Sequence, residues 1–145
     1  MLKRREEIRR EEKGGEGDSL RNGSSEGRPG LLSAKRENKR AARVGFDWNE
    51  LPPVIAKIRE ELGEVEAVLS DPQKVEDEIG DLLFSVVNLA RKLKVDGEVA
   101  LQKATDKFSS RFRKLEAIAS ERDLPLERMS LAELDAIWDE VKASK

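Results

Sequence analysis

Hydrophobic residues recur at helical spacing along residues 45–145, and none of this stretch alternates like a β-strand. Four segments carry an apolar stripe of this kind. Its positions are Ile55, Ile58, Leu62, Val65 and Leu69 in the first, Ile79, Leu82, Leu83, Val86, Leu89, Ala90 and Leu93 in the second, Val99, Ala104, Phe108, Phe112, Leu115 and Ile118 in the third, and a last run that includes Trp138. The pattern predicts an all-α domain of four helices.

Residue types between the stripes fit helix ends. Pro52 and Pro53 suit the first turn of a helix, and Asp96 suits an N-cap. The other boundary signals are the Ser-Asp-Pro break at 70–72, a third helix over about 98–121, and a capping box of Ser130 and Glu133 that opens a last helix to about Lys142. We therefore expect a small four-helix bundle.

The second stripe is wide, because Val87 lies beside Val86. A thin bundle would leave part of this surface in water, so we expect a homodimer that completes the core. A monomeric bundle is the alternative.

Residues 1–44 differ in composition from the rest. They contain a Gly/Ser-containing stretch, and a short charged helix over 4–13 and a frayed helix over 31–44 are the elements to expect. We predict a largely flexible, connector-like segment over 1–44 and a folded domain over 45–145. The segment carries thirteen basic and eight acidic residues. Its mixed charge and its lack of aromatic residues argue against nucleic-acid binding.

Composition removes several kinds of chemistry. The 145-residue chain has no histidine, cysteine or tyrosine. Disulfides, thiolate nucleophiles, histidine bases and His/Cys zinc sites are therefore excluded, which leaves carboxylates, lysine, arginine, hydroxyls or a hard metal. The longest apolar stretch, Leu82–Ala90, is too short to span a bilayer, and we expect a cytoplasmic protein without membrane contact.

Two acidic clusters point to a metal site. Glu61 and Glu64 share one side of the first helix, and Glu78 and Asp81 share one side of the second. If these helices pack antiparallel, the four carboxylates converge and need a hard cation, Mg²⁺ or Mn²⁺, between them. Gly63 and Gly80 suggest a close approach of the two helices here. The alternative is a set of ordinary solvated carboxylates.

Basic residues supply the other half of a phosphate site. Candidates for polyphosphate binding are Lys74, Lys107, Arg111 and Lys142. Trp138 and Lys142 form an i,i+4 pair near the C-terminus. The alternative is ordinary surface charge, with Trp138 in the core.

Motifs from Arg40 to Lys142 resemble the MazG-type nucleoside triphosphate pyrophosphohydrolases of the all-α NTP pyrophosphatase superfamily. The resemblance rests on RAARVGFDW at 40–48, EELGE at 60–64, EIGDLLF at 78–84, VNLAR at 87–91, ALQKA at 100–104, KFSSRF at 107–112, and Trp138 with Lys142.

This resemblance implies Mg²⁺-dependent hydrolysis of NTPs and dNTPs, with relaxed specificity, to the monophosphate and pyrophosphate. A house-cleaning role in nucleotide pools and a bundle homodimer are also implied. The implied roles are metal binding by Glu61, Glu64, Glu78 and Asp81, positioning of the water by Glu60 or Glu61, phosphate contacts by Lys57, Lys74, Lys107 and Arg111, and nucleotide contact by Trp138.

Two departures support a rival hypothesis, a catalytically weak or inactive nucleotide-binding or regulatory helical dimer. Thr105 stands where the family usually has Asn. Two-domain members also have an N-terminal domain, and residues 4–42 resemble the connector between the two domains. We therefore expect this chain to correspond to the C-terminal half.

Overall fold

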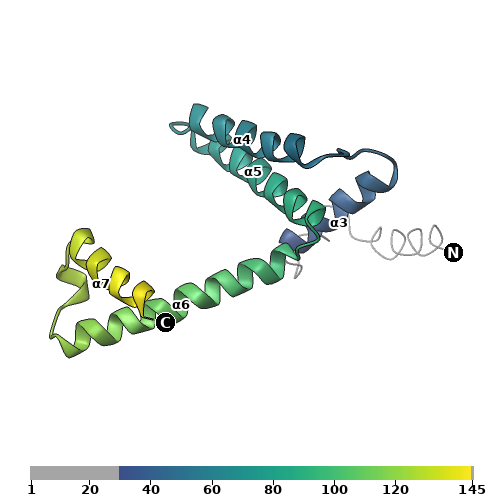
Figure 1. Cartoon of the computed structure of the whole chain (residues 1–145). Helices are drawn as coiled ribbons and strands as arrows, with labels where there is room; N and C mark the ends of the chain where they lie inside the picture. The colour runs from purple at the N-terminus through teal and green to yellow at the C-terminus, as the bar shows by residue number, and fades with distance from the viewer. Residues whose placement is uncertain (1–29, 145) are drawn as a thin grey trace, which may run out of the picture. The chain divides into compact units, whose positions relative to one another are not determined.

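The computed structural model describes residues 30–144, and the residues in this range form helices without any strand (Figure 1). The elements are α3 (Gly30–Arg43), α4 (Leu51–Ala67), α5 (Pro72–Lys92), α6 (Gly97–Glu121), the short 3₁₀ helix η1 (Leu126–Arg128) and α7 (Leu131–Ala143). The all-α prediction is confirmed. The expected elements within 1–29 lie outside the described residues.

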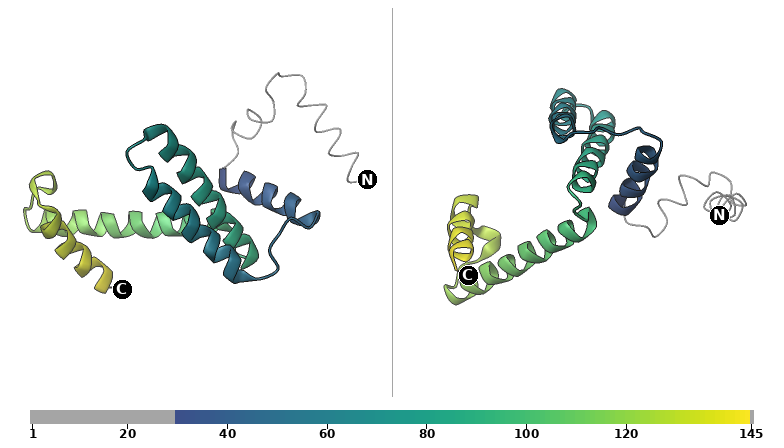
Figure 2. Two further views of the ribbon diagram at one scale, coloured as in Figure 1. Left: turned by 90° about the horizontal axis from the view of Figure 1, so that it is seen from above. Right: turned by 45° about the vertical axis from the view of Figure 1, so that its right-hand side comes forward.

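The chain divides into two compact units, with the boundary after Glu98. In the first unit, α4 and α5 form an antiparallel helical hairpin, and α3 packs against α5 (Figures 1 and 2). Prolines open α4 as expected, and the Asp71 side chain caps α5 by accepting a hydrogen bond from the Lys74 backbone amide at 3.3 Å. This tight connection sets the two helices side by side.

The buried face of the hairpin differs from the apolar stripes. The residues that α4 and α5 bury are Val54 and Glu61, and Ser85, Val87 and Asn88. Ile79, Leu83, Val86 and Leu93 were expected to be buried but remain exposed. The reason is that the side of α5 on which Ser85 and Asn88 lie is the side that meets its neighbours within this unit. The wide stripe is left uncovered, and homodimerisation stays a prediction.

The second unit has its own small core. Leu115, Ile137 and Val141 are buried, and Trp138 packs against them. The predicted capping box is present, with both Ser130 and Glu133 making their reciprocal hydrogen bonds at the start of α7. No helix within residues 30–144 combines the length and apolarity needed to cross a bilayer.

Candidate metal and nucleotide site

Three of the four predicted carboxylates meet between α4 and α5. Oxygens of Glu61, Glu78 and Asp81 all lie within 4.8 Å of one another. Glu61 is only 8% exposed, Glu78 is half-buried and Asp81 is exposed. The antiparallel hairpin produces this convergence, because the second half of α4 lies against the first half of α5. Oxygen donors at this separation suit a hard cation such as Mg²⁺ or Mn²⁺.

The fourth carboxylate, Glu64, acts on the cluster through its charge. Burial is the largest cause of a raised pKa at Glu78, and the charges of Glu64, Asp81 and Glu61 raise that pKa further. Glu64 does not belong to the close triad, but it adds to the same negative potential. A bound cation would relieve this repulsion.

Lys57 partly neutralises the cluster. Its Nζ lies 2.8 Å from Glu61 Oε1 and 3.3 Å from Glu60 Oε1. Hydrogen bonds to Glu61 and then to Glu60 are the largest causes of a raised pKa at Lys57. The pairing follows from the i,i+4 and i,i+3 spacing on α4. Lys57 is therefore the predicted phosphate-binding residue that the structure places at the carboxylates.

Replacing Lys57 with methionine should lower the free energy of unfolding of the metal-free chain by about 1 kcal/mol. Buried Glu61 loses the ammonium group that pairs with it, and solvent partly screens that pair. Mg²⁺ should shrink the difference, because the metal takes over the neutralising role. Thermal unfolding followed by circular dichroism in EDTA and in Mg²⁺ measures both effects, with Lys74→Met as the exposed control. An equal loss of stability in EDTA and in Mg²⁺ would contradict this interpretation.

The other basic candidates lie in the first turn of α5 or in the second unit. Lys74 Nζ is 3.9 Å from Asp71 on an exposed surface. In the second unit, Phe108 of α6 and Trp138 of α7 have ring centroids 5.3 Å apart, and Lys107 and Arg111 lie on α6 beside this contact in sequence. Lys142 pairs with Asp139 at 3.6 Å. Their phosphate-binding roles stay predictions.

Gly63 and Gly80 do not mark a close helix contact. A methyl group added at either position would have no neighbour within 4 Å. The expectation of tight packing there is wrong, because both glycines face open space. Thr105, where the family usually has Asn, satisfies its hydroxyl by donating to the Leu101 carbonyl at 2.9 Å.

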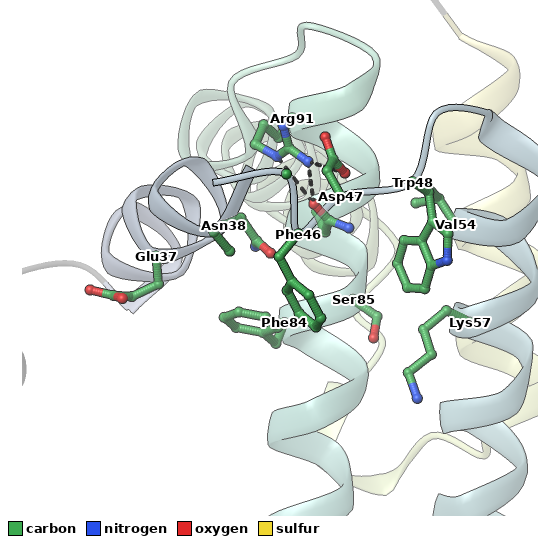
Figure 3. A pocket seen from close by; sticks show the side chains of 13 residues that line it. Glu37, Asn38, Phe46, Asp47, Trp48, Val54, Lys57, Phe84, Ser85 and Arg91 are labelled. Atoms are coloured by element: carbon green, nitrogen blue, oxygen red, sulfur yellow. Dashed lines mark hydrogen bonds and ion pairs between the residues drawn. The ribbon is translucent and has the colours of Figure 1, made fainter. Parts of the chain in front are cut away.

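A pocket of about 560 Å³ lies in the first unit, and Lys57 belongs both to its lining and to the carboxylate cluster (Figure 3). This volume is in the range of small-molecule sites. The other side chains relevant here come from α3, from the loop before α4 and from α5. They are Asn38, Phe46, Asp47, Trp48, Phe84, Ser85, Asn88 and Arg91.

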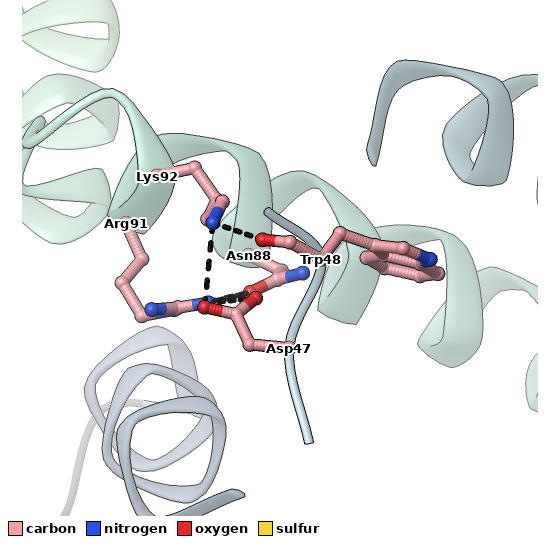
Figure 4. A network of polar contacts seen from close by, with 5 residues as sticks. All are labelled: Asp47, Trp48, Asn88, Arg91 and Lys92. Atoms are coloured by element: carbon pink, nitrogen blue, oxygen red, sulfur yellow. Dashed lines mark hydrogen bonds and ion pairs between the residues drawn. The ribbon is translucent and has the colours of Figure 1, made fainter. Parts of the chain in front are cut away.

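An ion-pair network fastens the loop before α4 to α5 (Figure 4). Arg91 Nη2 donates to Asp47 Oδ1 at 2.8 Å and to Asn88 Oδ1 at 3.0 Å. Lys92 Nζ lies 3.3 Å from Asp47 Oδ2 and also donates to the Trp48 backbone carbonyl. The network therefore fixes the segment that carries Phe46 and Trp48.

The stability contributed by Asp47 should depend on pH. Burial acts to raise the pKa of Asp47, but hydrogen bonds from Arg91 and Lys92 outweigh it and lower the pKa below the ordinary 3.8. The stability that ionised Asp47 contributes is thus complete above about pH 4, and it is lost as the pH falls through the lowered pKa of Asp47. Urea unfolding at pH 6 and at pH 2.5 checks this. The gap in stability between the native chain and Asp47→Asn should narrow at the lower pH, and a constant gap would argue against it.

Among the pocket residues, the sequence assigned a role to Lys57 alone, as a phosphate contact. Asn38 fell in the segment expected to be connector-like, and Phe46, Trp48, Asn88 and Arg91 served only as family motif positions. One signal was available, since Ser85 and Asn88 interrupt the apolar pattern of the second helix at i,i+3 spacing. Polar residues within such a stripe are candidates for a site rather than for the core.

Comparisons with known proteins agree with the motifs. Residues 52–115 match the family model described as the MazG nucleotide pyrophosphohydrolase domain. A protein of Escherichia coli K12 named nucleoside triphosphate pyrophosphohydrolase is 46% identical over 119 residues, which are 79% of this chain and 45% of that protein. A Thermotoga maritima protein named nucleoside triphosphate pyrophosphohydrolase/pyrophosphatase MazG is 43% identical over 137 residues, 94% of this chain and 53% of its own length.

A third relative, the uncharacterized protein YabN of Bacillus subtilis, is 43% identical over 68 residues, 47% of this chain and 14% of that protein. The chain spans about half the length of the first two relatives. The predicted resemblance to the MazG family is confirmed.

Proposed function

We propose that this chain, which is similar to the MazG nucleotide pyrophosphohydrolases over residues 52–115, hydrolyses nucleoside triphosphates to monophosphates and pyrophosphate. The observation that carries the proposal is the carboxylate triad of Glu61, Glu78 and Asp81, whose oxygens lie within 4.8 Å of one another. Both ribo- and deoxyribonucleotides with different bases are included. Such an activity would suit house-cleaning of cytoplasmic nucleotide pools.

The proposed metal ligands are Glu61, Glu64, Glu78 and Asp81, with Mg²⁺ as the metal and Mn²⁺ as a substitute. When bound, the metal neutralises phosphate oxygens and lowers the pKa of coordinated water. Oxygen-only donors and the raised pKa of Glu78 both support a cation at this place.

The protein side chains then position the reactants. Glu60 or Glu61 orients a water and accepts its proton as the water oxygen attacks the α-phosphorus, while the bond from that phosphorus to the bridging oxygen breaks and pyrophosphate leaves. Lys57 is adjacent to both carboxylates and can transfer its hydrogen bonds from Glu61 to a phosphate oxygen. The remaining phosphate contacts are proposed for Lys74, Lys107, Arg111 and Lys142, and contact with the nucleotide for Trp138.

Pyrophosphate release from a panel of NTPs and dNTPs, with Mg²⁺ or with EDTA, tests the activity. We expect release from several substrates in Mg²⁺, and none in EDTA. Mn²⁺ should restore release after EDTA is removed. An absence of release from every substrate, together with an absence of nucleotide binding in calorimetry, would refute the proposal.

A nucleotide-binding or regulatory role without turnover is the second candidate. Thr105 favours it, because its hydroxyl is used within its own helix and its side chain is shorter than the family's Asn. Calorimetry separates the candidates: binding of nucleotide without any pyrophosphate release would favour the regulatory role.

We also propose a homodimer. Ile55 and Leu62 of α4, with Leu83 and Val86 of α5, remain exposed apolar side chains on the hairpin and support this assembly. Sedimentation equilibrium over a range of protein concentrations tests it. A monomer at all concentrations would exclude the homodimer.

A further inference from the structure

The pocket and the carboxylate triad are parts of one continuous arrangement on α4 and α5. Lys57 lines the pocket and contacts Glu61 at 2.8 Å. On α5, Asp81 is followed at i+4 and i+7 by Ser85 and Asn88, which line the pocket. At about 1.5 Å rise per residue, Asn88 lies about 10 Å along the helix from Asp81. A ligand with its reactive phosphate at the triad would thus reach the pocket with its other end.

Aromatic surface forms the walls of the pocket. Phe46, Trp48 and Phe84 line it and are 81%, 41% and 45% exposed (Figure 3). These rings are in water in the free chain, so a flat aromatic ligand would remove apolar area from water and stack on a ring face. The chemistry favours a heteroaromatic ring over a flexible aliphatic chain.

Asn38 supplies a polar group without a partner. The residue is 9% exposed, it lines the pocket, and its Nδ2 makes no hydrogen bond among residues 30–144. A buried amide donor is normally paired. Figure 3 places the Asn38 side chain beside Phe46, whose ring is largely exposed.

We propose that this pocket holds the base of the nucleoside triphosphate, and that the Asn38 amide donates a hydrogen bond to an acceptor on the edge of that base. The identity of the ligand rests on the proposed function. The ribose spans the stretch between Asp81 and Asn88, and the Arg91 network holds the Phe46–Trp48 wall in place. Asn38 is then a specificity-determining residue, and α3 is part of the substrate site.

Kinetics with ATP, GTP, CTP and UTP test this assignment. The variants are Asn38→Leu, Asn38→Asp and, as control, Lys39→Leu, an exposed neighbour that does not line the pocket. Loss of one neutral hydrogen bond should raise KM about three- to tenfold in Asn38→Leu, with a smaller change in kcat. Asn38→Asp, which replaces the amide donor with acceptors, should reorder the four bases. Inhibition by inorganic triphosphate, which has no base, should be unchanged.

A binding measurement gives a readout that does not depend on turnover. The native chain has two tryptophans, so the Trp48 signal is the part of the fluorescence that a Trp48→Phe variant lacks, and nucleosides without phosphate should quench that part. Asn38→Leu should weaken the quenching by the same three- to tenfold factor. Circular dichroism shows whether each variant folds. If Asn38→Leu does not fold, the base order and the quenching measured with Asn38→Asp test the proposal.

The outcomes distinguish this proposal from the proposed function. Equal KM values and base order in the three variants, with normal pyrophosphate release, overturn the base pocket and leave the activity intact. If the native chain releases no pyrophosphate, the proposed activity is refuted. Quenching of Trp48 by nucleosides then still tests whether the pocket binds a base. Trp48 fluorescence could instead change with protein concentration and stay the same when nucleosides are added. That result would mean that a second copy of the chain fills the pocket, and it would overturn the proposal.

Discussion

Replacing Glu61 with glutamine should lower pyrophosphate release by about a hundredfold or more while the helices stay intact. Removal of a group that only supports a metal ligand lowers metal affinity or activity about 10- to 100-fold. Removal of a ligand itself should lower activity at least as much. Glu61 is the most buried carboxylate of the triad and also contacts Lys57, so no solvent-exposed neighbour can replace it easily. Asp81→Asn should show the same loss.

Steady-state pyrophosphate release at saturating Mg²⁺ measures this effect, and circular dichroism checks helicity. Glu66→Gln is the matched control, because Glu66 is an exposed carboxylate on the same helix and lies outside the triad. The control should keep its activity. Full turnover in both Glu61→Gln and Asp81→Asn would show that the proposed metal ligands are assigned wrongly.

Replacing Arg91 with methionine should lower the free energy of unfolding by about 2 kcal/mol. Charged hydrogen bonds of partly buried groups contribute about 1.5–3 kcal/mol, and Arg91 donates to both Asp47 and Asn88. The two ion-paired side chains are 14% and 20% exposed, so solvent screens them only partly. Lys92 still pairs with Asp47 in the variant, which keeps the loss below that of a fully broken buried pair.

Urea unfolding followed by circular dichroism gives this free energy, and Arg59→Met on the exposed side of α4 is the control. A double-mutant cycle with Asp47→Asn isolates the pair. Trp48 fluorescence in the native baseline should also shift, because the loop that carries Trp48 is released. Equal stability of Arg91→Met and Arg59→Met would mean that the network does not hold this loop.

The helices and the carboxylates were predictable because their signals are local. Pro52 suits the first turn of α4 through its fixed backbone angle. Asp71 and the Ser130–Glu133 box cap their helices through hydrogen bonds within a few residues. The approach of Glu61 to Asp81 needed one further assumption, an antiparallel hairpin across a short turn. Their functional roles, and those of the basic residues, remain proposals.

The pocket was not predictable in the same way, because it depends on which face of α5 is covered. Apolar spacing favoured burial of Leu83 and Val86, yet Ser85 and Asn88 are buried instead. That choice is made by α3, which packs against α5, and by the loop at Asp47, which Arg91 holds through an ion pair. Asn38 lies in a segment whose composition suggested a connector, and nothing in its local sequence indicates burial against α5.

The short turn between α4 and α5 has a consequence for how the cation site arises during folding. Glu61 and Asp81 are twenty positions apart and are brought together by a single helical hairpin. The entropy lost in closing such a short loop is small, and local contacts of this kind form early. A cation that binds there would stabilise the hairpin in proportion to the logarithm of its concentration. Magnesium would then act on the folding of this unit as well as on its chemistry, with its largest effect on the two helices that hold it.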